Sequence, residues 1–428
     1  MKPPVVGFAG MTHLGLVSAS AVAGRGIEVV CFDGDRSLID RLARQEWPVL
    51  EPGLDDLIRG NGARQRFTAT RGDLASCDIV YVAPDVPTDD QGNSDVAGLT
   101  ALIRDVAATM NSDAVMVVLS QVPPGYTRAL GVLPPERLYY QVETLVFGQA
   151  VERAVKPERT IVGCVDPGKP LDARFRAVLD AFGCPILPMR YESAELAKIS
   201  INCCLVASVT VANTLAELCE KMGADWSEIA PALKLDRRIG PHAYLTPGLG
   251  IAGGNLERDL ATVARLSQAL GTDAGIVQAW LHNSRHRRDW AVRTIRDAVL
   301  DRNPDAILAI WGLAYKANTH SAKNSPSLAT ISQLERARLR VHDPVVSSTV
   351  LGRPDVEDCA DPITAATGAD AVMILTPWPA YGAIAPMKLA GVLRGTTVVD
   401  PYGVLDGKKV RSAGLTYYTL GQAPIVAT

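Results

Sequence analysis

Two blocks of alternating apolar runs and helical patterns lie on either side of a long helical stretch, and this order constrains the fold most. The first block has apolar runs of strand length at residues 5–9, 28–32, 79–83, 114–119 and 160–164. The second block has such runs at 306–311, 338–342, 371–376 and 396–400. Short apolar runs separated by helices are typical of parallel sheets with helices on both faces.

The stretch between the two blocks has a different pattern. Residues from about 193 to 286 are alanine-rich and mostly helical, and they are interrupted by a segment rich in glycine and proline at 240–255. A chain of 428 residues can hold more than one core. We therefore predict an α/β protein with two Rossmann-like, doubly wound domains, 1–192 and 301–428, joined by a central all-helical domain, 193–300.

Composition narrows the class of protein. The chain is 47% hydrophobic and 21% charged, with a formal net charge of −3, which is ordinary for a globular enzyme and favours neither a nucleic-acid nor a membrane partner. No apolar run reaches the roughly 18 residues of a membrane span, and the start of the chain resembles a strand rather than a signal peptide. We expect a cytoplasmic protein. The eight cysteines form no C-x-x-C pair, so we predict no metal site.

A dinucleotide-binding turn is predicted at the end of the first strand. Gly10 and Gly15 bracket a segment that leads from this strand into a helix, where backbone N–H groups can hold a pyrophosphate. The middle glycine of the usual G-x-G-x-x-G pattern is Thr12. Asp33 ends the second strand, where a carboxylate accepts from ribose hydroxyls and repels a 2′-phosphate, so NAD is favoured over NADP. The expected cofactor contacts are Gly10, Thr12, His13, Leu14, Gly15, Asp33, Arg36, Ser120 and Gln121.

Residues 247–259 form the most distinctive motif, P-G-L-G-I-A-G-G-N-L-E-R-D. This motif resembles the substrate loop of the UDP-glucose/GDP-mannose 6-dehydrogenase family, P-G-x-G-F-G-G-x-C-x-P-K-D. Segments 48–54, 120–125, 195–202, 236–240 and 312–319 resemble the family's P-x-x-E-P-G-L, S-T-V-P-x-G, E-L-x-K-x-x-x-N, D-x-R-I-G and G-x-x-F-K-x-x-T in the same order. The resemblance covers nearly the whole chain and implies NAD, a sugar substrate and a central helix that builds a homodimer.

The resemblance also implies catalytic roles. Lys198 and Asn202, four residues apart and thus on one helical face, would hold the reacting oxygen. Asp259 would orient the lysine or a water. A desolvated lysine can serve as a base or stabilise a developing alkoxide, which suits the oxidation of a hydroxyl.

Three departures from the family change the expected chemistry. Asn255 replaces the cysteine that traps an aldehyde in the family, and an amide cannot act as that nucleophile. Phe147 replaces the second glutamate of P-E-F-L-x-E-G, whereas the first is kept as Glu143, and Gln121 replaces a threonine. We predict one two-electron oxidation, of C6 to an aldehyde or of C4 to a ketone, with Asn255 near the sugar.

The substrate end of the chain also departs from the family. Tyr402 stands in place of the arginine of D-G-R, which contacts the diphosphate, so that group is held differently or is absent. A sugar nucleoside is then a plausible substrate beside a nucleotide sugar. The expected substrate contacts are Arg238, Tyr244, Gly248, Gly250, Gly253, Lys316 and Tyr402.

Three other functions remain open at this stage. The enzyme could oxidise the sugar fully to a uronic acid through an aldehyde hydrate. It could act as a non-redox epimerase with tightly held NAD. The chain could also be a silent sugar-nucleotide-binding protein.

Overall fold

The computed structural model describes residues 3–89, 92–251 and 255–427. The chain forms two compact units, Met1–Ile201 and Asn202–Thr428. Each unit contains one sheet, and the helix α8 (Tyr191–Met222) runs through the boundary between them. The division into three domains stays a prediction.

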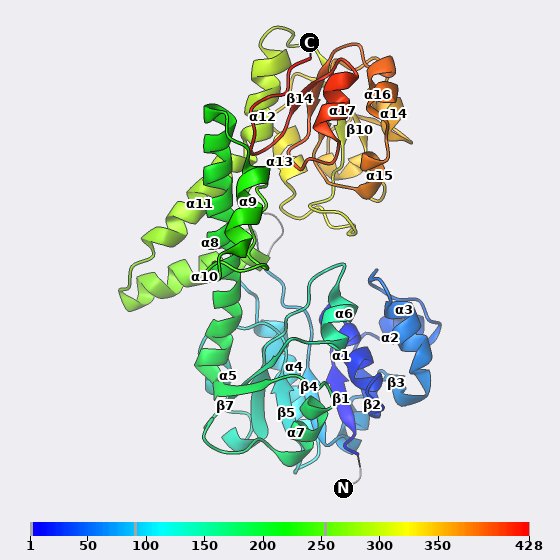
Figure 1. Cartoon of the computed structure of the whole chain (residues 1–428). Coiled ribbons are helices and arrows are strands. Elements are labelled where there is room, and N and C mark those ends of the chain that lie inside the picture. Colours follow the sequence, from blue (N-terminus) through cyan, green and yellow to red (C-terminus); the bar gives the residue numbers. More distant parts are fainter. Residues whose placement is uncertain (1–2, 90–91, 252–254, 428) are drawn as a thin grey trace. The chain divides into compact units, whose positions relative to one another are not determined.

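The first unit is built on an eight-stranded sheet with the order β3-β2-β1-β4-β5-β6-β7-β8 (Figure 1). Only the pair β6–β7 is antiparallel within it. The strands are β1 (Val6–Ala9), β2 (Val29–Phe32), β3 (Gln65–Thr68), β4 (Ile79–Val82), β5 (Val115–Val118), β6 (Leu138–Gln141), β7 (Thr160–Cys164) and β8 (Ile186–Arg190). The helices are α1 (His13–Ala23), α2 (Arg36–Ala43), α3 (Leu54–Gly60), α4 (Ala97–Thr109), α5 (Tyr126–Ala129), α6 (Ala150–Val155) and α7 (Ala173–Asp180).

Both faces of this sheet are buried. Val115 and Val117 of β5 pack in one apolar cluster, while Met116 and Val118 pack in a second cluster. Successive side chains of a strand point to opposite faces, so the two clusters lie on opposite sides of the sheet. This arrangement explains why the central strands are continuous apolar runs rather than alternating ones.

The second unit contains a six-stranded parallel sheet with the order β11-β10-β9-β12-β13-β14. Its strands are β9 (Ile307–Trp311), β10 (Arg338–His342), β11 (Glu357–Asp358), β12 (Ala371–Ile374), β13 (Thr397–Val399) and β14 (Thr416–Tyr418). The helices around it are α13 (Pro326–Ile331), α14 (Pro362–Ala366), α15 (Pro379–Gly382), α16 (Pro386–Val392) and α17 (Gly407–Ser412). The unit also holds α9 (Trp226–Leu235), α10 (Asn255–Leu270), α11 (Gly275–Arg288) and α12 (Trp290–Ile295).

The two sheets repeat one topology. Strands β1 to β6 and β9 to β14 follow the same spatial order, 3-2-1-4-5-6, which is that of a doubly wound dinucleotide fold. The order in which strands are added to the sheet reverses between β1 and β4 and again between β9 and β12, and ligands of such folds bind at this switch point. The predicted fold, with two Rossmann-like domains joined by a helical middle, is confirmed.

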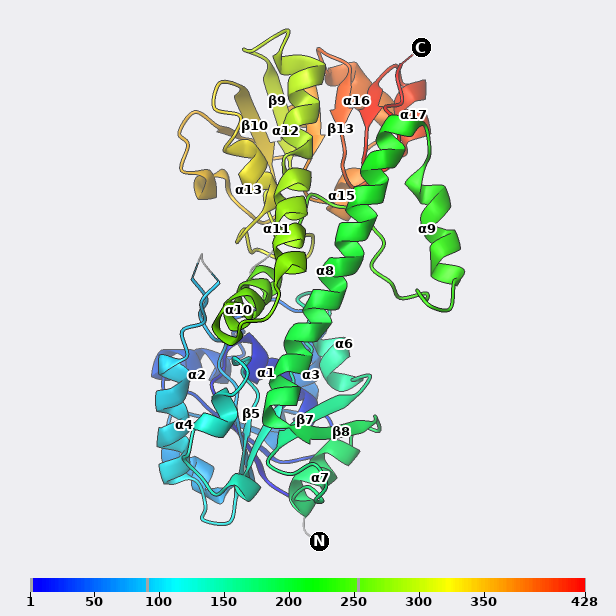
Figure 2. The ribbon, with the colours of Figure 1, turned by 90° about the vertical axis from the view of Figure 1, so that its left-hand side faces the viewer.

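Helix α8 is a single continuous helix of 32 residues (Figure 2). Among the described residues it alone has the length and composition that would let a helix cross a membrane, and one third of its most apolar window is buried. Its exposed apolar side chains Val211, Leu215, Leu218 and Met222 recur at spacings of four, three and four residues. That spacing is typical of a seam between packed helices.

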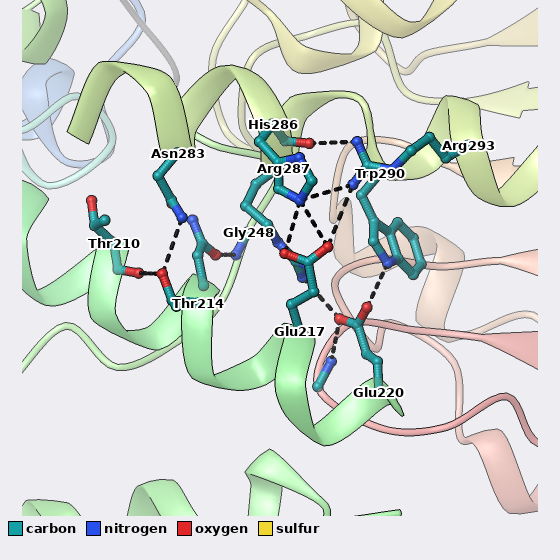
Figure 3. A network of polar contacts seen from close by, with 12 residues as sticks. Thr210, Thr214, Glu217, Glu220, Gly248, Asn283, His286, Arg287, Trp290 and Arg293 are labelled. Carbon is teal, nitrogen blue, oxygen red and sulfur yellow. Dashed lines mark hydrogen bonds and ion pairs between the residues drawn. The ribbon is translucent and has the colours of Figure 1, made fainter. Parts of the chain in front are cut away.

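The opposite side of the C-terminal part of α8 carries a buried ion-pair network (Figure 3). The Arg287 side chain is fully buried, and its Nη2 lies 2.8 Å from Oε1 of Glu220. Glu220 also accepts from the indole N–H of Trp290 at 2.9 Å and from the backbone N–H of Gly421 at 3.0 Å. Glu217 contacts Arg287 at 3.3 Å. Glu220 therefore joins α8 to α12, to the end of α11 and to the C-terminal segment.

We expect the Glu220→Ala change to destabilise the protein strongly. Removing one partner of a buried ion pair leaves an uncompensated charge and costs about 3–5 kcal/mol. Chemical denaturation of the wild type and the variant measures this loss in the free energy of unfolding. The control is Glu357→Gln, which breaks an ion pair of 2.9 Å between Arg340 and a glutamate that is 58% exposed. This control should cost under about 1 kcal/mol, and equal losses would contradict the assignment of Glu220 as a hub.

Candidate active site

The turn after β1 requires its two glycines. Gly10 has a φ of +98°, and a Cβ there would lie 2.7 Å from the backbone nitrogen of Pro84. A Cβ on Gly15 would lie 1.8 Å from the carbonyl oxygen of Gly10. The turn can therefore be tight only without side chains at both positions, as a close approach of backbone to pyrophosphate demands.

Two hydrogen bonds fix this turn to the ends of the neighbouring strands β2 and β4. The backbone N–H of Met11 donates to Oδ2 of Asp33 at 2.7 Å. The backbone N–H of Asp85 donates to the Thr12 hydroxyl at 2.8 Å. Helix α1 begins at His13, so its first N–H groups face the space beyond the carboxyl end of β1, where an anionic ligand is favoured.

The predicted cofactor residues gather at one edge of the sheet. Residues 10–15 follow β1, Asp33 and Arg36 follow β2, and Ser120 and Gln121 follow β5. These strands are parallel, so their carboxyl ends meet at the same edge. The Ser120 hydroxyl donates to the carbonyl of Pro84 at 2.6 Å, which ties the end of β5 to the turn beside Gly10. The residues present fit a nicotinamide dinucleotide.

A contact that the motifs did not reveal lies beside this turn. Nε2 of His13 lies 2.9 Å from Oε1 of Glu51, whose side chain is fully buried. The Phe147 ring stacks on the His13 ring with centroids 4.3 Å apart and an interplanar angle of 24°. Glu51 also accepts from the backbone N–H of Gly148 at 2.9 Å, next to Phe147. Phe147 is thus held in place, although 44% of it is exposed.

Lys198 pairs with Glu143 in the first unit. The Lys198 Nζ lies 2.7 Å from Oε1 of Glu143, and the two side chains are only 10% and 14% exposed. The backbone N–H of Leu145 donates to the other Glu143 oxygen at 3.0 Å. One turn before Lys198, buried Glu195 accepts from the backbone N–H groups of Gly125 and Thr127 at 2.6 and 2.9 Å. Burial raises the pKa of Glu195, although these donors work against the rise.

Asn202 pairs with Asp259 in the second unit. The Asn202 side-chain nitrogen donates to Oδ2 of Asp259 at 2.5 Å, and both residues are buried. Arg258, also buried, places its Nε 3.4 Å from Oδ1 of Asp259. Asn255 is the first residue of α10 and is exposed. Sequence reasoning missed Arg258, which occupies the lysine position of the P-K-D motif.

The segment that leads to Asn255 is fixed by α8 and α11. The backbone N–H of Gly248 donates to Oδ1 of Asn213 at 2.8 Å. Gly250 has a φ of +72°, and a Cβ there would lie 2.4 Å from the carbonyl oxygen of Ser284. The backbone N–H of Ile251 donates to the Ser284 hydroxyl at 2.8 Å. Gly253, a predicted substrate contact, lies outside the described residues.

The second sheet has the same kind of turn as the first, a glycine turn whose backbone N–H groups donate to an aspartate at the end of the neighbouring strand. Gly312 follows β9 with a φ of +101°, and a Cβ there would lie 2.4 Å from Cβ of Thr376. The backbone N–H groups of Leu313 and Ala314 donate to Oδ2 of Asp343 at 2.7 and 3.0 Å. The equivalent strand ends therefore form equivalent turns in the two units.

The remaining predicted substrate residues lie in the second unit. Lys316 follows this second turn and places Nζ 5.5 Å from the centre of the Tyr315 ring. Tyr402 follows β13 and packs against the core of this unit. Arg238 is 88% exposed and pairs with Asp236, and Tyr244 is 54% exposed. Among the described residues, no cluster of three histidine, cysteine or acidic side chains could hold a metal ion.

A glycine turn braced by a strand-end aspartate, at the switch point of a doubly wound sheet, is typical of a nucleotide-binding domain. Three domains of one family match the chain: an NAD binding domain at residues 5–179, a central domain at 192–285 and a UDP binding domain at 309–407. The chain belongs to the UDP-glucose/GDP-mannose dehydrogenase family. The resemblance, the NAD cofactor and the class of NAD-dependent sugar dehydrogenase predicted from the sequence are confirmed.

Individual relatives match over nearly the full length. A UDP-glucose 6-dehydrogenase of Bacillus subtilis is 28% identical over 438 residues, covering 98% of this chain and 93% of that protein. One from Pseudomonas aeruginosa is 29% identical over 439 residues, covering 96% of each. The solved structure of a UDP-glucose dehydrogenase from Pyrobaculum islandicum has a TM-score of 0.85 and 28% identity, covering 98% of each chain.

Asp33 provides a test of the cofactor site. We expect Asp33→Asn to raise the KM for NAD about 10-fold and to allow use of NADP, because the carboxylate that accepts from ribose and repels a 2′-phosphate is lost. Steady-state kinetics with both cofactors measures this change. The control is Asp35→Asn, which removes the same charge two residues away, where Asp35 caps α2. An equal shift in the control would refute the ribose role.

Proposed function

We propose that this enzyme oxidises one hydroxyl of a UDP-linked sugar, or of a related sugar nucleoside, once, to an aldehyde at C6 or a ketone at C4. The observation that carries the proposal is the contact between Lys198 and Glu143. The Glu143 carboxylate, 2.7 Å away and nearly buried, holds the Lys198 ammonium in one place. A charged donor held beside the reacting hydroxyl can stabilise the alkoxide that develops as the hydride leaves.

Lys198 then acts as a charged hydrogen-bond donor. Its ammonium donates to the oxygen of the sugar hydroxyl, and the hydroxyl proton passes to a water molecule. The carbon loses a hydride at the same time, so two electrons and two hydrogens leave the carbinol. Bound NAD supplies the hydride acceptor.

Asn202 is assigned to the same oxygen. Asn202 lies one helical turn after Lys198 on α8, so helix geometry places the two side chains on one face. One N–H of its amide donates to Asp259, and this contact orients the amide. Its second N–H is then available to the developing alkoxide, a charge-assisted bond that strengthens as negative charge grows.

Two residues support a single oxidation. Asn255 stands at the nucleophile position and cannot form a covalent adduct with an aldehyde as a thiolate does. Phe147 stands where the family motif has its second glutamate, and its ring is stacked on His13. An aromatic ring neither activates nor orients a water. These two positions therefore lack the nucleophile and the second glutamate of the family motifs, which supports a single oxidation.

The match of residues 309–407 to a UDP binding domain supports a UDP-linked substrate, as does the substrate in the names of the relatives. Lys316 is assigned to the phosphate or sugar. Tyr402 offers a hydroxyl and a ring face where the family motif has arginine, so we propose that the diphosphate is bound more weakly.

We further propose a homodimer. The exposed apolar seam of α8, Val211, Leu215, Leu218 and Met222, would be buried by a second copy. Its spacing suits helix–helix packing. The cytoplasmic location stays a prediction.

The stoichiometry of NADH tests the proposed function. We expect one NADH per sugar and a product lighter by two hydrogens when the enzyme is incubated with NAD and a panel of UDP-sugars and sugar nucleosides. Absorbance and product mass measure both quantities. Lys198→Ala is the control, and its kcat should fall about 10²–10³-fold because the developing alkoxide loses its charged donor.

Other outcomes would select the other functions. Two NADH and a carboxylate would mean that a hydrate is oxidised without a covalent intermediate. A changed sugar without net NADH would indicate an epimerase. Absence of turnover across the panel would favour a sugar-nucleotide-binding protein.

Cys203 is a thiol beside Asn202, and its protonation state decides whether it could serve as a nucleophile in place of the missing cysteine. It follows Asn202 on α8 and packs beside Val206 and Ile251. Burial, with the charge of Asp259, raises the pKa of Cys203 to about 11. At pH 7 only about one part in 10⁴ of such a thiol is thiolate, the reactive form.

We therefore expect Cys203→Ser to keep kcat within about twofold of the wild-type value, because a protonated thiol takes no part as nucleophile. NADH production by the purified variant measures this. A loss of activity comparable to that of Lys198→Ala would show that the catalytic thiol has moved to α8.

A further inference from the structure

Glu257 is the third residue of α10, two residues after Asn255 and two before Asp259. The family motif has proline at this position, so the carboxylate departs from that motif. Both of its oxygens are engaged. Oε1 lies 3.0 Å from Nη2 of Arg288, and Oε2 accepts from the side-chain nitrogen of Asn324 at 2.5 Å.

Arg288 reaches the chain on both sides of Asn255. The same Nη2 that contacts Glu257 donates to the carbonyl oxygen of Ile251 at 3.4 Å. One guanidinium at the end of α11 thus contacts the residue four before Asn255 and the residue two after it. Because Arg288 belongs to α11, its contacts with Ile251 and Glu257 tie both positions to that helix.

Asn324 belongs to the turn that carries Lys316. Its φ is +51°, a left-handed conformation that is uncommon outside glycine. The backbone N–H of Tyr315 donates to the carbonyl of Ser321 at 3.0 Å, and the Ser325 hydroxyl donates to the carbonyl of Leu313 at 2.8 Å. The segment from Gly312 to Ser325 is therefore closed on itself, and Glu257 contacts it near its end.

We propose that Glu257 is a positioning residue that couples the Lys316 segment to the placement of Asn255 and Asp259. This inference rests on the proposed function, because the reaction is the one assigned above. Contact of a sugar nucleotide with the Lys316 segment would be transmitted through Asn324 and Glu257 to the first turn of α10. Neither Glu257 nor Arg288 touches the reacting atoms.

The exposure of the pair favours positioning over stability. The Arg288 and Glu257 side chains are 24% and 28% exposed, and exposed ion pairs add at most about 1 kcal/mol to folding. A displacement of about 1 Å at a reaction centre can cost about 100-fold in rate. The effect of losing Glu257 should therefore appear in turnover before it appears in the melting temperature.

The test is Glu257→Ala, assayed for NADH formation with the UDP-sugar that the wild type oxidises. We expect kcat to fall about 10-fold, because the contact through which the Lys316 segment positions Asn255 and Asp259 is removed. The KM for NAD should stay unchanged, since the cofactor residues lie on the first sheet. Glu257→Gln keeps an acceptor for Asn324 and should retain an intermediate kcat.

Two further variants separate this role from a general loss of structure. Asn324→Gly keeps a left-handed position but removes the donated bond, so it should lower kcat, and combining it with Glu257→Ala should cost no more than Glu257→Ala alone. Gln45→Gly is the matched control, since Gln45 has a φ of +64° and lies outside the Lys316 segment. Its kcat should equal that of the wild type.

The outcomes are decisive. A normal kcat in Glu257→Ala, or additive losses in the double variant, would overturn the inference while the wild type still produced NADH. A fall in melting temperature with unchanged kcat would make Glu257 a merely structural residue and would also overturn it. An inactive wild type would refute the proposed function instead.

Discussion

The pitch of α8 is the constraint on which the proposed chemistry depends. At 3.6 residues per turn, residues 198 and 202 share a face, and the exposed apolar seam lies on a different side from Glu217 and Glu220. One helix therefore presents the candidate catalytic pair, anchors the chain through Arg287 and leaves an apolar strip for a partner. Each of these faces is fixed by backbone hydrogen bonds rather than by side-chain packing.

Buried carboxylates hold the loops on which the candidate site is built. Glu51, Glu195 and Asp343 each accept backbone N–H groups from segments far away in the sequence. Burial alone raises the pKa of such a carboxyl group, and in Glu195 that effect prevails. In Asp343 burial also works to raise the pKa, but four backbone N–H donors outweigh it and lower the pKa. Glu195 is fully buried, whereas Asp343 is half-buried and has more backbone donors, so the pKa shifts of these two groups differ in sign.

Strand identity could be predicted for most strands that are buried on both faces of a sheet, although the buried strand β6 was missed. β5 is a continuous apolar run, but β3 begins with Gln65 and has two solvent-contacting positions, and β8 contains Pro188 and is largely exposed. These strands at the sheet edges lack the pattern on which the prediction relied. β11 was missed for a related reason, since it is a two-residue edge strand with both side chains exposed.

The candidate site could also be predicted only in part from the sequence. The motifs identified Lys198, Asn202 and Asp259 because their spacing repeats that of a family. They did not reveal that Glu143 is the partner of Lys198, nor that Phe147 rests on His13, 134 positions earlier in the sequence. Such contacts depend on how loops from different strand ends pack together in three dimensions. No local sequence pattern predicts that packing.

The continuity of α8 also limits how a chain of this kind can diverge. A substitution on the apolar seam alters one contact, but a single inserted residue between Lys198 and Asn202 would rotate everything after it by about 100°. Asn202 would leave the face of Lys198. Change in this helix is therefore expected to proceed by replacement of side chains, with its length preserved.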